Sequence, residues 1–428
     1  MSFPRYPKYK DSGVEWLGQV PEHWEVKRLK HNLRLLTEKT DRRENPVALE
    51  NIEGWTGRFI STETEFEGEG IAFDAGDILF GKLRPYLAKA LRAGSSGEAV
   101  GDFHVMRPVA GINSRFAQYQ ILNREFIAIV DGSTFGSKMP RASWEFVGGM
   151  KVTTPPQAEQ KSIAAFLDQE TAKIDELVAE QQRLMELLKE KRQAVISHAV
   201  TKGLNPKAAL KPSGIEWLGD VPAHWEVTKI KRLASRISSG KTPLGGSEIY
   251  VDEGITFLRS QNIYDEGLRL DDVVFITEAV DEAMSVSRVK ANDILLNITG
   301  ASIGRSCVVP SELPSANVNQ HVCVIRLENS SQVPFVGWLF KSATIKNQID
   351  HAQNGAAREG LNFVQIGTMS VALPPAAEQE SIASFLNLQT VQLDALNAEA
   401  QRAIDLLQER RTALISAAVT GQIDVRKT

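Results

Sequence analysis

Residues 155–203 read PPQAEQKSIAAFLDQETAKIDELVAEQQRLMELLKEKRQAVISHAVTKG, a run that has no proline or glycine between its opening Pro155-Pro156 and its closing Gly203. Proline at the first turn and glycine just past the last turn are the expected ends of a helix. At ~1.5 Å per residue such a helix is roughly 65 Å long, far longer than an ordinary globular helix. The run therefore predicts one long helix around which the chain is organised.

The apolar residues of this run follow a seven-residue repeat. The main row holds Leu167, Ile174, Leu188 and Val195, with Gln181 interrupting it, and a second row, offset by three, holds Leu177 and Leu184. Such a seam requires a partner helix. The segment from Pro374 to Gly421 has a main row of Leu386, Leu393, Ala400, Leu407 and Leu414 and a second row of Leu396 and Ala403. We predict that the two helices form an intramolecular antiparallel coiled coil.

Two pairs of matching segments show that the chain is a duplication. KDSGVEWLGQVPEHWEVKRLKHNLR (10–34) matches KPSGIEWLGDVPAHWEVTKIKRLAS (211–235), an offset of 201, and TPPQAEQKSIAAFLD (154–168) matches LPPAAEQESIASFLN (373–387), an offset of 219. The second half thus carries 18 more residues (219 − 201) between its matching ends. A period this long indicates duplicated domains and not a solenoid. Similar ends around dissimilar middles indicate a shared frame that holds two different inserts.

Both inserts have the pattern of mixed α/β structure, so the fold class we predict is α+β. The first has strand-like runs at 70–73, 77–80 and 100–106 before a helical stretch at 116–126. The second has runs at 293–296 and 321–327 before a helical stretch at 336–349, and residues 202–212 read as a linker. The predicted divisions are a first domain at 1–154, a central helix at 155–203, a second domain at 204–373 and a C-terminal helix at 374–428. Two copies of domain-then-helix, packed antiparallel, would be related by a pseudo-two-fold axis.

Composition narrows the classes of protein. The chain has 428 residues, of which 42% are apolar, 24% are charged and two are cysteines, Cys307 and Cys323. Neither a signal peptide nor an apolar run long enough to span a bilayer is visible, so we expect a cytoplasmic protein. Two cysteines are too few for a disulfide framework and wrongly spaced for a zinc site. The net charge is −4, whereas a protein that grips nucleic acid alone is usually basic.

The motifs of the duplication resemble one known family. They are the twice-used SG-x-EWLG-x-VP-x-HWEV opening, the twice-used PP-x-x-EQ-x-x-IA-x-FL helix start, and the segments GDILF…KLRPYL and NDILLNITGASIGRS. Over nearly the whole chain they are similar to the specificity subunit of type I restriction–modification systems. The resemblance implies two target-recognition domains that each read one half of a bipartite DNA site. It also implies a non-catalytic subunit whose helices dock two adenine methyltransferase subunits, joined in the full complex by restriction (translocase–nuclease) subunits.

Patterns for catalysis are incomplete in this chain. Residues 239–242, SGKT, end like a phosphate-binding loop, but Ser235 stands where that loop needs its first glycine. Residues 25–27, EVK, suggest a nuclease carboxylate–lysine pair, but the duplicate at 226–228 reads EVT. The seven histidines show no ligand spacing. We predict no catalytic residue, no metal and no cofactor, and a nucleotide-binding enzyme centred on Lys241 is the weakest alternative.

Polar and basic clusters near glycine-bounded turns are the candidates for reading DNA, because such side chains can pair with base edges or phosphates. The first insert offers Lys82, Arg84, Tyr86, Lys138 and Arg141, and the second offers Asn297, Thr299, Ser302, Arg305, Asn319, Gln320 and Arg358. The alternative is that these are solvated loop ends, or that the KLRPYL and TGASIGRS segments hold the shape of their domains. The four tryptophans of the opening motifs are expected to pack each domain on the helices.

The predicted function is a reader of a bipartite, asymmetric DNA site. Half-sites about one helical turn apart, roughly 34 Å, fit within the length of the helices. Because the inserts differ, the half-sites should differ as well. The alternative from another class is a structural adaptor whose helices space two protein-binding domains.

Overall fold

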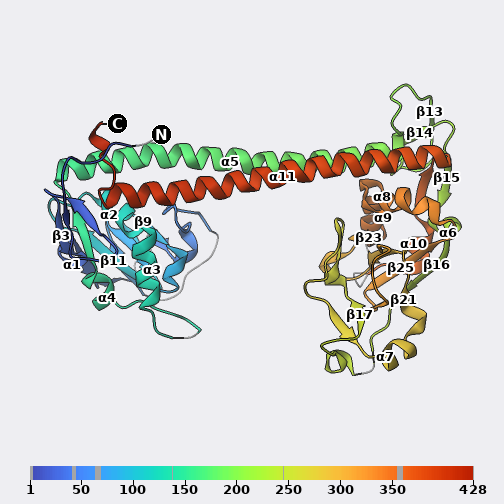
Figure 1. Ribbon diagram of the computed structural model, residues 1–428, viewed down its shortest axis with the longest axis horizontal. Helices are drawn as coiled ribbons and strands as arrows, with labels where there is room; N and C mark the ends of the chain where they lie inside the picture. The colour runs from blue at the N-terminus through green and yellow to red at the C-terminus, as the bar shows by residue number, and fades with distance from the viewer. Residues whose placement is uncertain are drawn as a thin grey trace. The chain divides into compact units, whose positions relative to one another are not determined.

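The chain forms two compact units, which are described separately. The computed structural model describes residues 3–40, 45–62, 69–136, 138–243, 245–353 and 360–427. Unit 1 consists of residues 1–182 with 401–428, and unit 2 consists of residues 183–400. Each unit combines a mixed α/β globule with part of both long helices (Figure 1), so the predicted fold class is confirmed. Within the described ranges, no helix is both long and apolar enough to cross a membrane.

The two long helices are α5 (Gln157–Lys202) and α11 (Ala376–Val419). Each begins directly after its proline pair, because proline has a φ suited to a helix start and lacks an N–H that would be unpaired there. Gly203 and Gly421 follow the two ends with φ of +75° and +78°, a left-handed conformation that costs glycine little. With 46 and 44 residues the helices are about 69 and 66 Å long.

Within each unit the two helices run antiparallel. In unit 1, Arg426, just beyond α11, contacts Glu159 at 3.2 Å, whereas Arg411 contacts Asp175 at 3.1 Å. Residues that increase along α5 therefore face residues that decrease along α11. Unit 2 shows the same order, because Arg192 is paired with Asp394 while the later Gly203 lies beside Glu378.

Most of the main row of the seam is buried as predicted, with Val195 and Leu407 half-buried, but the predicted second row was wrong. Leu177, Leu184 and Leu396 are 44%, 41% and 53% exposed. The buried second row lies four residues after the main row instead of three, and it includes Thr171, Thr390, Ile404, Arg411 and Ala418. Either offset fits a 3.5-residue repeat. Polar residues are accepted there because each threonine hydroxyl donates to the carbonyl four residues earlier and the arginine is paired with a carboxylate.

Unit 1 contains two four-stranded sheets. The first has the order β4-β11-β8-β9 and is antiparallel, and the second has the order β5-β7-β10-β6, with β6 parallel to β10. The strands of the four-stranded sheets are β4 (Leu33–Leu36), β5 (Lys39–Thr40), β6 (Pro46–Val47), β7 (Gly70–Phe73), β8 (Ile78–Gly81), β9 (Ala90–Arg92), β10 (Gly97–Val100) and β11 (Phe103–Pro108). Two strand pairs complete the unit, β1 (Tyr9–Asp11) with β2 (Gln19–Pro21) and β3 (Glu25–Arg28) with β12 (Lys151–Thr154). Its short helices are α1 (Leu29–Asn32), α2 (Ser114–Ile121), α3 (Arg124–Gly132), α4 (Trp144–Gly149) and the 3-10 turns η1 (Leu49–Asn51), η2 (Pro85–Leu87) and η8 (Val425–Lys427).

Unit 2 also has two four-stranded sheets, in the orders β16-β25-β22-β23 and β20-β17-β24-β21. Their strands are β16 (Ala234–Ser239), β17 (Ile255–Leu258), β20 (Val274–Ile276), β21 (Arg288–Val289), β22 (Ile294–Asn297), β23 (Ser306–Val308), β24 (Ala316–Val318) and β25 (Val322–Leu327). The strand pairs are β13 (Leu210–Pro212) with β14 (Asp220–Pro222), β15 (Glu226–Lys229) with β26 (Ser370–Leu373), and β18 (Ile263–Tyr264) with β19 (Gly267–Leu268). The short helices are α6 (Ile230–Leu233), α7 (Glu278–Ala283), α8 (Val333–Lys341), α9 (Ala343–Gln353), α10 (Phe363–Thr368) and the turns η3 (Gly246–Ile249), η4 (Ser260–Asn262), η5 (Ser285–Ser287), η6 (Gly300–Ser302) and η7 (Ser330–Gln332).

The two globules share a frame and differ at its edge. Their first sheets have the same strand order, and their second sheets share a three-strand core, β7-β10-β6 in one and β21-β24-β17 in the other. The fourth strand differs, since β5 joins the β7 edge in unit 1 whereas β20 joins the β17 edge in unit 2. The duplicated frame with dissimilar inserts, predicted from the sequence, is therefore visible in the sheets.

Each predicted helical stretch of the inserts is two helices. In the first insert the break falls at Asn123, whose side chain accepts hydrogen bonds from the backbone N–H groups of Glu125 and Phe126. In the second insert the break falls at Ser342, between α8 and α9. An asparagine or serine that caps a new helix start ends the preceding helix, although the apolar spacing continues through it.

The opening motif of each repeat is bonded to the start of its long helix. In unit 1 the carboxylate of Glu159 accepts a hydrogen bond from Trp24 Nε1 at 2.9 Å and lies 2.7 Å from His23 Nε2. In unit 2 Glu378 accepts from Trp225 Nε1 at 3.1 Å and lies 2.8 Å from His224 Nε2. In both repeats the His-Trp pair of the opening motif thus contacts the glutamate of the helix-start motif. The expected packing role is visible for Trp24 and Trp225, which are 0% and 1% exposed.

Glu159→Ala should destabilise unit 1 more than Glu378→Ala destabilises unit 2. Glu159 also accepts from the hydroxyl of Tyr6 and from Arg426, and the loss of a buried carboxylate that serves several donors costs about 3 kcal/mol. Glu378 is more exposed and has the two donors named above, so about 1 kcal/mol is expected. Denaturant unfolding of the two variants measures both values, and equal losses would contradict this account.

Candidate nucleic-acid interface

In the first insert, two loops far apart in sequence meet. Leu83 forms an isolated β-bridge with Arg141, and Arg141 forms another with Phe135. The backbone N–H of Arg84 donates to the carbonyl of Pro140 at 2.8 Å. The candidates at 82–86 and 138–141 therefore belong to one surface, which we call the first loop pair (residues 82–87 and 135–141, apart from Ser137).

Two of these candidates are held by one carboxylate. Arg141 makes a two-pronged contact with Asp102, at 3.0 and 2.8 Å, and Lys82 Nζ lies 3.6 Å from the same side chain. The hydrogen bonds from Arg141 hold the pKa of Asp102 below its usual range. Asp102 therefore stays ionised and fixes the base of the loop pair. Lys82 and Arg141 keep about a third of their side chains exposed.

The other three candidates of the first insert point to solvent without internal partners. Arg84, Tyr86 and Lys138 are exposed, and within the described part of the chain their side chains make no hydrogen bond or ion pair. Arg84 has a left-handed φ of +50° at the start of the turn η2, a strained conformation for a residue with a side chain. Long cationic side chains held outward on a rigid turn can contact phosphates or base edges.

In the second insert, the candidates surround the turn η6. Asn297 is fully buried, and its Nδ2 donates to the carbonyl of Ser260 and to the hydroxyl of Ser302. Thr299 Oγ1 lies 2.5 Å from His321 Nδ1, whose other ring nitrogen lies 2.9 Å from Gln320 Nε2. Asn297 thus shapes the turn, whereas Thr299, Ser302 and Gln320 are half-buried and form its rim.

Arg305 belongs to a cluster that the sequence analysis missed. Its guanidinium lies 4.9 Å from the ring centre of Tyr264, and the guanidinium of Arg269 lies 3.6 Å from the same ring. Both arginines are exposed. Of the remaining candidates, Asn319 accepts a hydrogen bond from the backbone N–H of His321, and Arg358 lies outside the described residues.

The glycine of the SGKT segment has a structural reason. A Cβ on Gly240 would lie 1.8 Å from the carbonyl oxygen of Val318, so this position accepts only glycine. The backbone N–H of Lys241 donates to the same carbonyl. The segment is therefore occupied by contacts at the end of β24, and the described residues contain no cluster of His, Cys, Asp and Glu suited to a metal ion.

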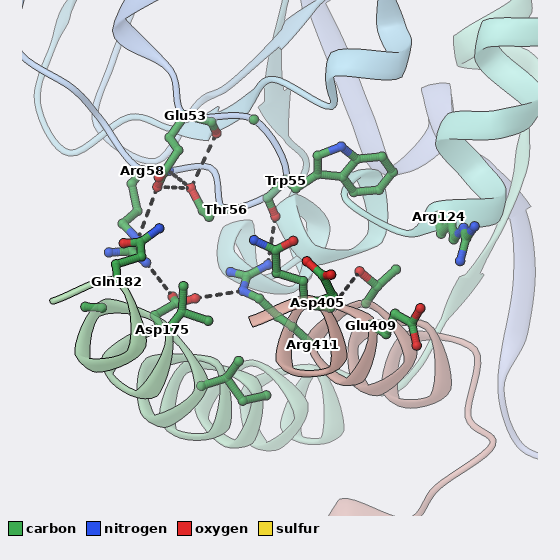
Figure 2. A pocket seen from close by; sticks show the side chains of 16 residues that line it. Glu53, Trp55, Thr56, Arg58, Arg124, Asp175, Gln182, Asp405, Glu409 and Arg411 are labelled. Atoms are coloured by element: carbon green, nitrogen blue, oxygen red, sulfur yellow. Dashed lines mark hydrogen bonds and ion pairs between the residues drawn. The ribbon is translucent and has the colours of Figure 1, made fainter. Parts of the chain in front are cut away.

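Unit 1 also contains a crevice of about 610 Å³ between its globule and the two long helices. It is lined by the loop 53–58, by Arg124 and by the facing sides of α5 and α11. Figure 2 shows Asp175 between Arg58 and Arg411, with Trp55 above the helices. The lining carries both signs of charge, and its groups largely bond one another, so the crevice is a junction between the globule and the helices.

Comparisons with known proteins agree on one family. A family model described as "Type I restriction modification DNA specificity domain" matches residues 222–404. The chain is 24% identical to the Type I restriction enzyme EcoBI specificity subunit of Escherichia coli over 320 residues, 73% of this chain and 66% of that protein. It is 21% identical to the Type I restriction enzyme MjaVIII specificity subunit of Methanocaldococcus jannaschii over 436 residues, 95% of each chain.

Residues 222–404 thus match the DNA specificity domain of type I restriction–modification systems, and the chain is similar to the specificity subunits of those systems. In fold, it is similar to a chain from a structure of the type I R-M system, with a TM-score of 0.73, 16% identity, and coverage of 94% of this chain and 98% of that one. The chain spans just under two thirds of the length of this Escherichia coli relative. The family predicted from the two repeated motifs is thereby confirmed.

The exposed or clustered residues that sequence reasoning missed near these candidates are aromatic or apolar. Phe135 and Met139 of the first loop pair are 65% and 49% exposed. In the second globule the guanidinium groups of two arginines lie over the ring of Tyr264. Such side chains lie outside the pattern of polar residues near glycines that indicated the other candidates. A signal for Phe135 was its position next to Gly136 and close to Lys138, since a strand or core residue would have had apolar neighbours.

Replacing Arg84 and Lys138 by alanine should weaken DNA binding by the assembled complex about tenfold at physiological salt and reduce the salt slope by about 2, because two phosphate contacts would be lost. Binding titrations over a range of salt concentrations measure both effects. Lys8→Ala is the matched control, since Lys8 is 76% exposed and lies outside the loop pair. An unchanged salt slope in the double variant would remove these two residues from the interface.

Proposed function

We propose that this specificity subunit reads a bipartite, asymmetric DNA site and positions two adenine methyltransferase subunits on it. The observation that carries the proposal is the combination of two globules that share a sheet frame but differ in surface chemistry. The first loop pair presents Arg84, Tyr86 and Lys138, whereas the second globule presents Arg269 and Arg305 around Tyr264. Different side chains on one frame suit two different half-sites.

The proposed domains have the boundaries that were predicted from the sequence. Residues 1–154 and 204–373 would be the two target-recognition domains, and residues 155–203 and 374–428 would be the helices that space them. Apart from the buried Asn297, the candidates of both inserts, including Arg358, remain proposed contacts. Their half-buried members would act through base edges only at the rim, since a buried amide such as that of Asn297 cannot reach DNA.

Exposed leucines at matching positions of the two helices support the docking of two copies of one partner. Leu177 and Leu187 of α5 are 44% and 50% exposed, and their counterparts at an offset of 219, Leu396 and Leu406 of α11, are 53% and 59% exposed. Each unit contains one member of each pair. Repeated exposed apolar positions indicate an interaction surface, and its duplication suits two methyltransferases.

The chemistry would take place in the partners. Each methyltransferase would flip one adenine out of the duplex, one on each strand, and modify it. Restriction subunits that join the same complex would act when the site is unmethylated. Such a complex would work in the cytoplasm, where the DNA is.

The specificity subunit alone should bind DNA weakly. With a net charge of −4 it adds little to the phosphate term that dominates affinity, so the methyltransferases must contribute most phosphate contacts. We expect a Kd in the range of non-specific binding, about 10⁻⁶ M or weaker, for the isolated chain at physiological salt. A titration with labelled duplex measures it, and nanomolar site-specific binding would contradict this view.

A binding selection separates DNA reading from the alternative of a structural adaptor. The purified complex with its methyltransferase is incubated with a random duplex pool, and bound DNA is sequenced over several rounds. The proposal predicts enrichment of a gapped motif with two different halves. If no motif is enriched although the complex is intact, the structural adaptor becomes the better account of the function.

A further inference from the structure

Two arginine–aspartate pairs occupy the same place in the two repeats, with the roles of the helices exchanged. Arg192 and Arg411 are related by the offset of 219, and so are Asp175 and Asp394. In unit 1, Arg411 of α11 pairs with Asp175 of α5 at 3.1 Å. In unit 2, Arg192 of α5 pairs with Asp394 of α11. The second seam row thus holds one arginine per helix, each matched by an acid on the other helix.

The pair in unit 1 is also bonded to the globule. The side chain of Arg411 is 10% exposed, and its Nη1 donates to the carbonyl of Trp55 at 2.7 Å. Asp175 accepts a second contact from Arg58 at 2.9 Å, as Figure 2 shows. A buried arginine that lost its carboxylate would be an uncompensated charge in the core, which is strongly unfavourable.

The pair in unit 2 is simpler and more exposed. The side chains of Arg192 and Asp394 are 23% and 56% exposed, and each is the other's ion-pair partner among the described residues. Arg192 lines a crevice between the helices and the second globule together with Glu186 and Glu190, which are the counterparts of Asp405 and Glu409 in the crevice of unit 1.

Only the observed register satisfies both arginines. If α5 slipped by one heptad in one direction, Arg411 would face Asp168, but Arg192 would face the uncharged Asn387. If it slipped in the other direction, the two arginines would face Gln182 and Gln401. Asp168 is moreover engaged by Arg115 and by the hydroxyl of Tyr119 in the first globule. The apolar rows alone would not discriminate, because a heptad slip returns every leucine to an equivalent place.

We propose that the pairs Asp175–Arg411 and Arg192–Asp394 select the register of the two long helices and thereby fix the number of unread bases between the half-sites. They are positioning residues, since they would act on DNA only through the placement of the globules. A polar residue at a core position commonly specifies register at some cost in stability. The part of the inference that concerns the spacer rests on the proposed bipartite reading, whereas the part that concerns the register does not.

Two readouts test the proposal in the complex of the full chain with its methyltransferase. The first is the spacer length in the methylated motif. In Asp175→Asn with Asp394→Asn we expect the preference for one spacer over neighbouring lengths to fall about tenfold or more, with half-sites unchanged.

The second readout, cross-linking of the two helices, needs no DNA. Cysteines at Val178 and Gln408, which line one crevice and lie one turn from the unit 1 pair, should be joined by a short bismaleimide in the parent chain. In the variant that carries both Asp175→Asn and Asp394→Asn (the neutralised variant), cross-links from position 178 to cysteines at 401 or 415 should appear as well. The native Cys307 and Cys323 are buried and do not compete.

Charge exchange gives the matched control. Asp394→Arg alone places two arginines opposite each other and should broaden the range of methylated spacer lengths. Arg192→Asp in the same chain should restore the single length, because each residue is the other's ion-pair partner. The equivalent exchange of Asp175 and Arg411 should not restore it, since Arg58 still needs an acid and the Trp55 carbonyl still needs a donor.

The outcomes separate the two proposals. A parent complex that methylates a continuous palindrome would overturn the proposed function, and the cross-links would still decide the register. A gapped parent motif whose spacer and cross-links are the same in the neutralised variant would overturn the register proposal alone. If the neutralised variant does not fold, the exchange in unit 2 decides, because failure of Arg192→Asp to rescue Asp394→Arg contradicts it.

Discussion

Deleting residues 179–185 from α5 together with 401–407 from α11 is expected to shorten the unread spacer by about 3 base pairs, because seven residues form about 10.5 Å of helix and DNA rises about 3.4 Å per pair. Each deleted block is one heptad long and lies between the two arginine–aspartate pairs. Both arginine–aspartate pairs stay within their units, and the seven-residue repeat is preserved. The bases of the two half-sites should not change, since no residue of either globule is removed.

Sequencing modified adenine in cells that express the shortened chain with its methyltransferase measures the result. Deletion of 179–185 alone is the control, and it should abolish assembly because the seam on one side of the cut loses its register. Methylation by the doubly shortened chain at the parent spacer would show that the helices do not set the distance.

Serine at Leu177 and Leu406 should remove one of the two methyltransferases from the complex, and serine at Leu187 and Leu396 should remove the other. The first two leucines belong to unit 1 and the second two to unit 2. Two half-exposed leucines that become buried on docking contribute about 2–4 kcal/mol, so each pair of substitutions should weaken its site roughly 30- to 1000-fold. The quadruple variant should bind no methyltransferase at micromolar concentration.

Native mass spectrometry of the co-purified complex counts the bound copies directly. Leu204→Ser with Leu210→Ser is the matched control, because these leucines are 40% and 49% exposed but lie outside the long helices, Leu204 after the end of α5 and Leu210 in β13. A quadruple variant that retains two methyltransferases would place the docking surface elsewhere.

The frame could be predicted from the sequence because its contacts lie within repeated motifs. His23 and Trp24 meet Glu159, and the same letters recur as His224, Trp225 and Glu378. Repetition of both partners at two places marks them as a structural unit. The ends of the long helices were predicted for a similar reason, since proline and glycine act on the local backbone and need no tertiary context.

The seam could be predicted only in part. Hydrophobicity pointed to the leucines at the offset of three, yet the core accepted Thr171 and Arg411 at the offset of four. The decisive signal was present in the sequence as charge. Asp175 and Arg192 recur as Asp394 and Arg411, and an antiparallel pair sets each acid against the arginine of the other helix. Counting apolar residues alone misses a core position that is polar but paired.

The surface loops were the least predictable part. Residue type indicated Arg84 and Lys138 correctly as exposed cations, but it could not show that Asn297 is buried or that Lys82 and Arg141 share Asp102. Those outcomes depend on which loops meet, which is decided by the β-bridges of residues distant in sequence. β8 pairs with β11 in the first globule, and this pairing places Asp102 beside the loop that follows β8.

The most direct test is to express the chain with the adenine methyltransferase proposed as its partner, in a host without adenine methylation, and to sequence the modified adenines of the genome. The account predicts one gapped motif with two unlike halves, a single spacer length and one modified adenine on each strand. Methylation of a continuous palindrome, or of a gapped site whose spacer varies freely, would contradict it.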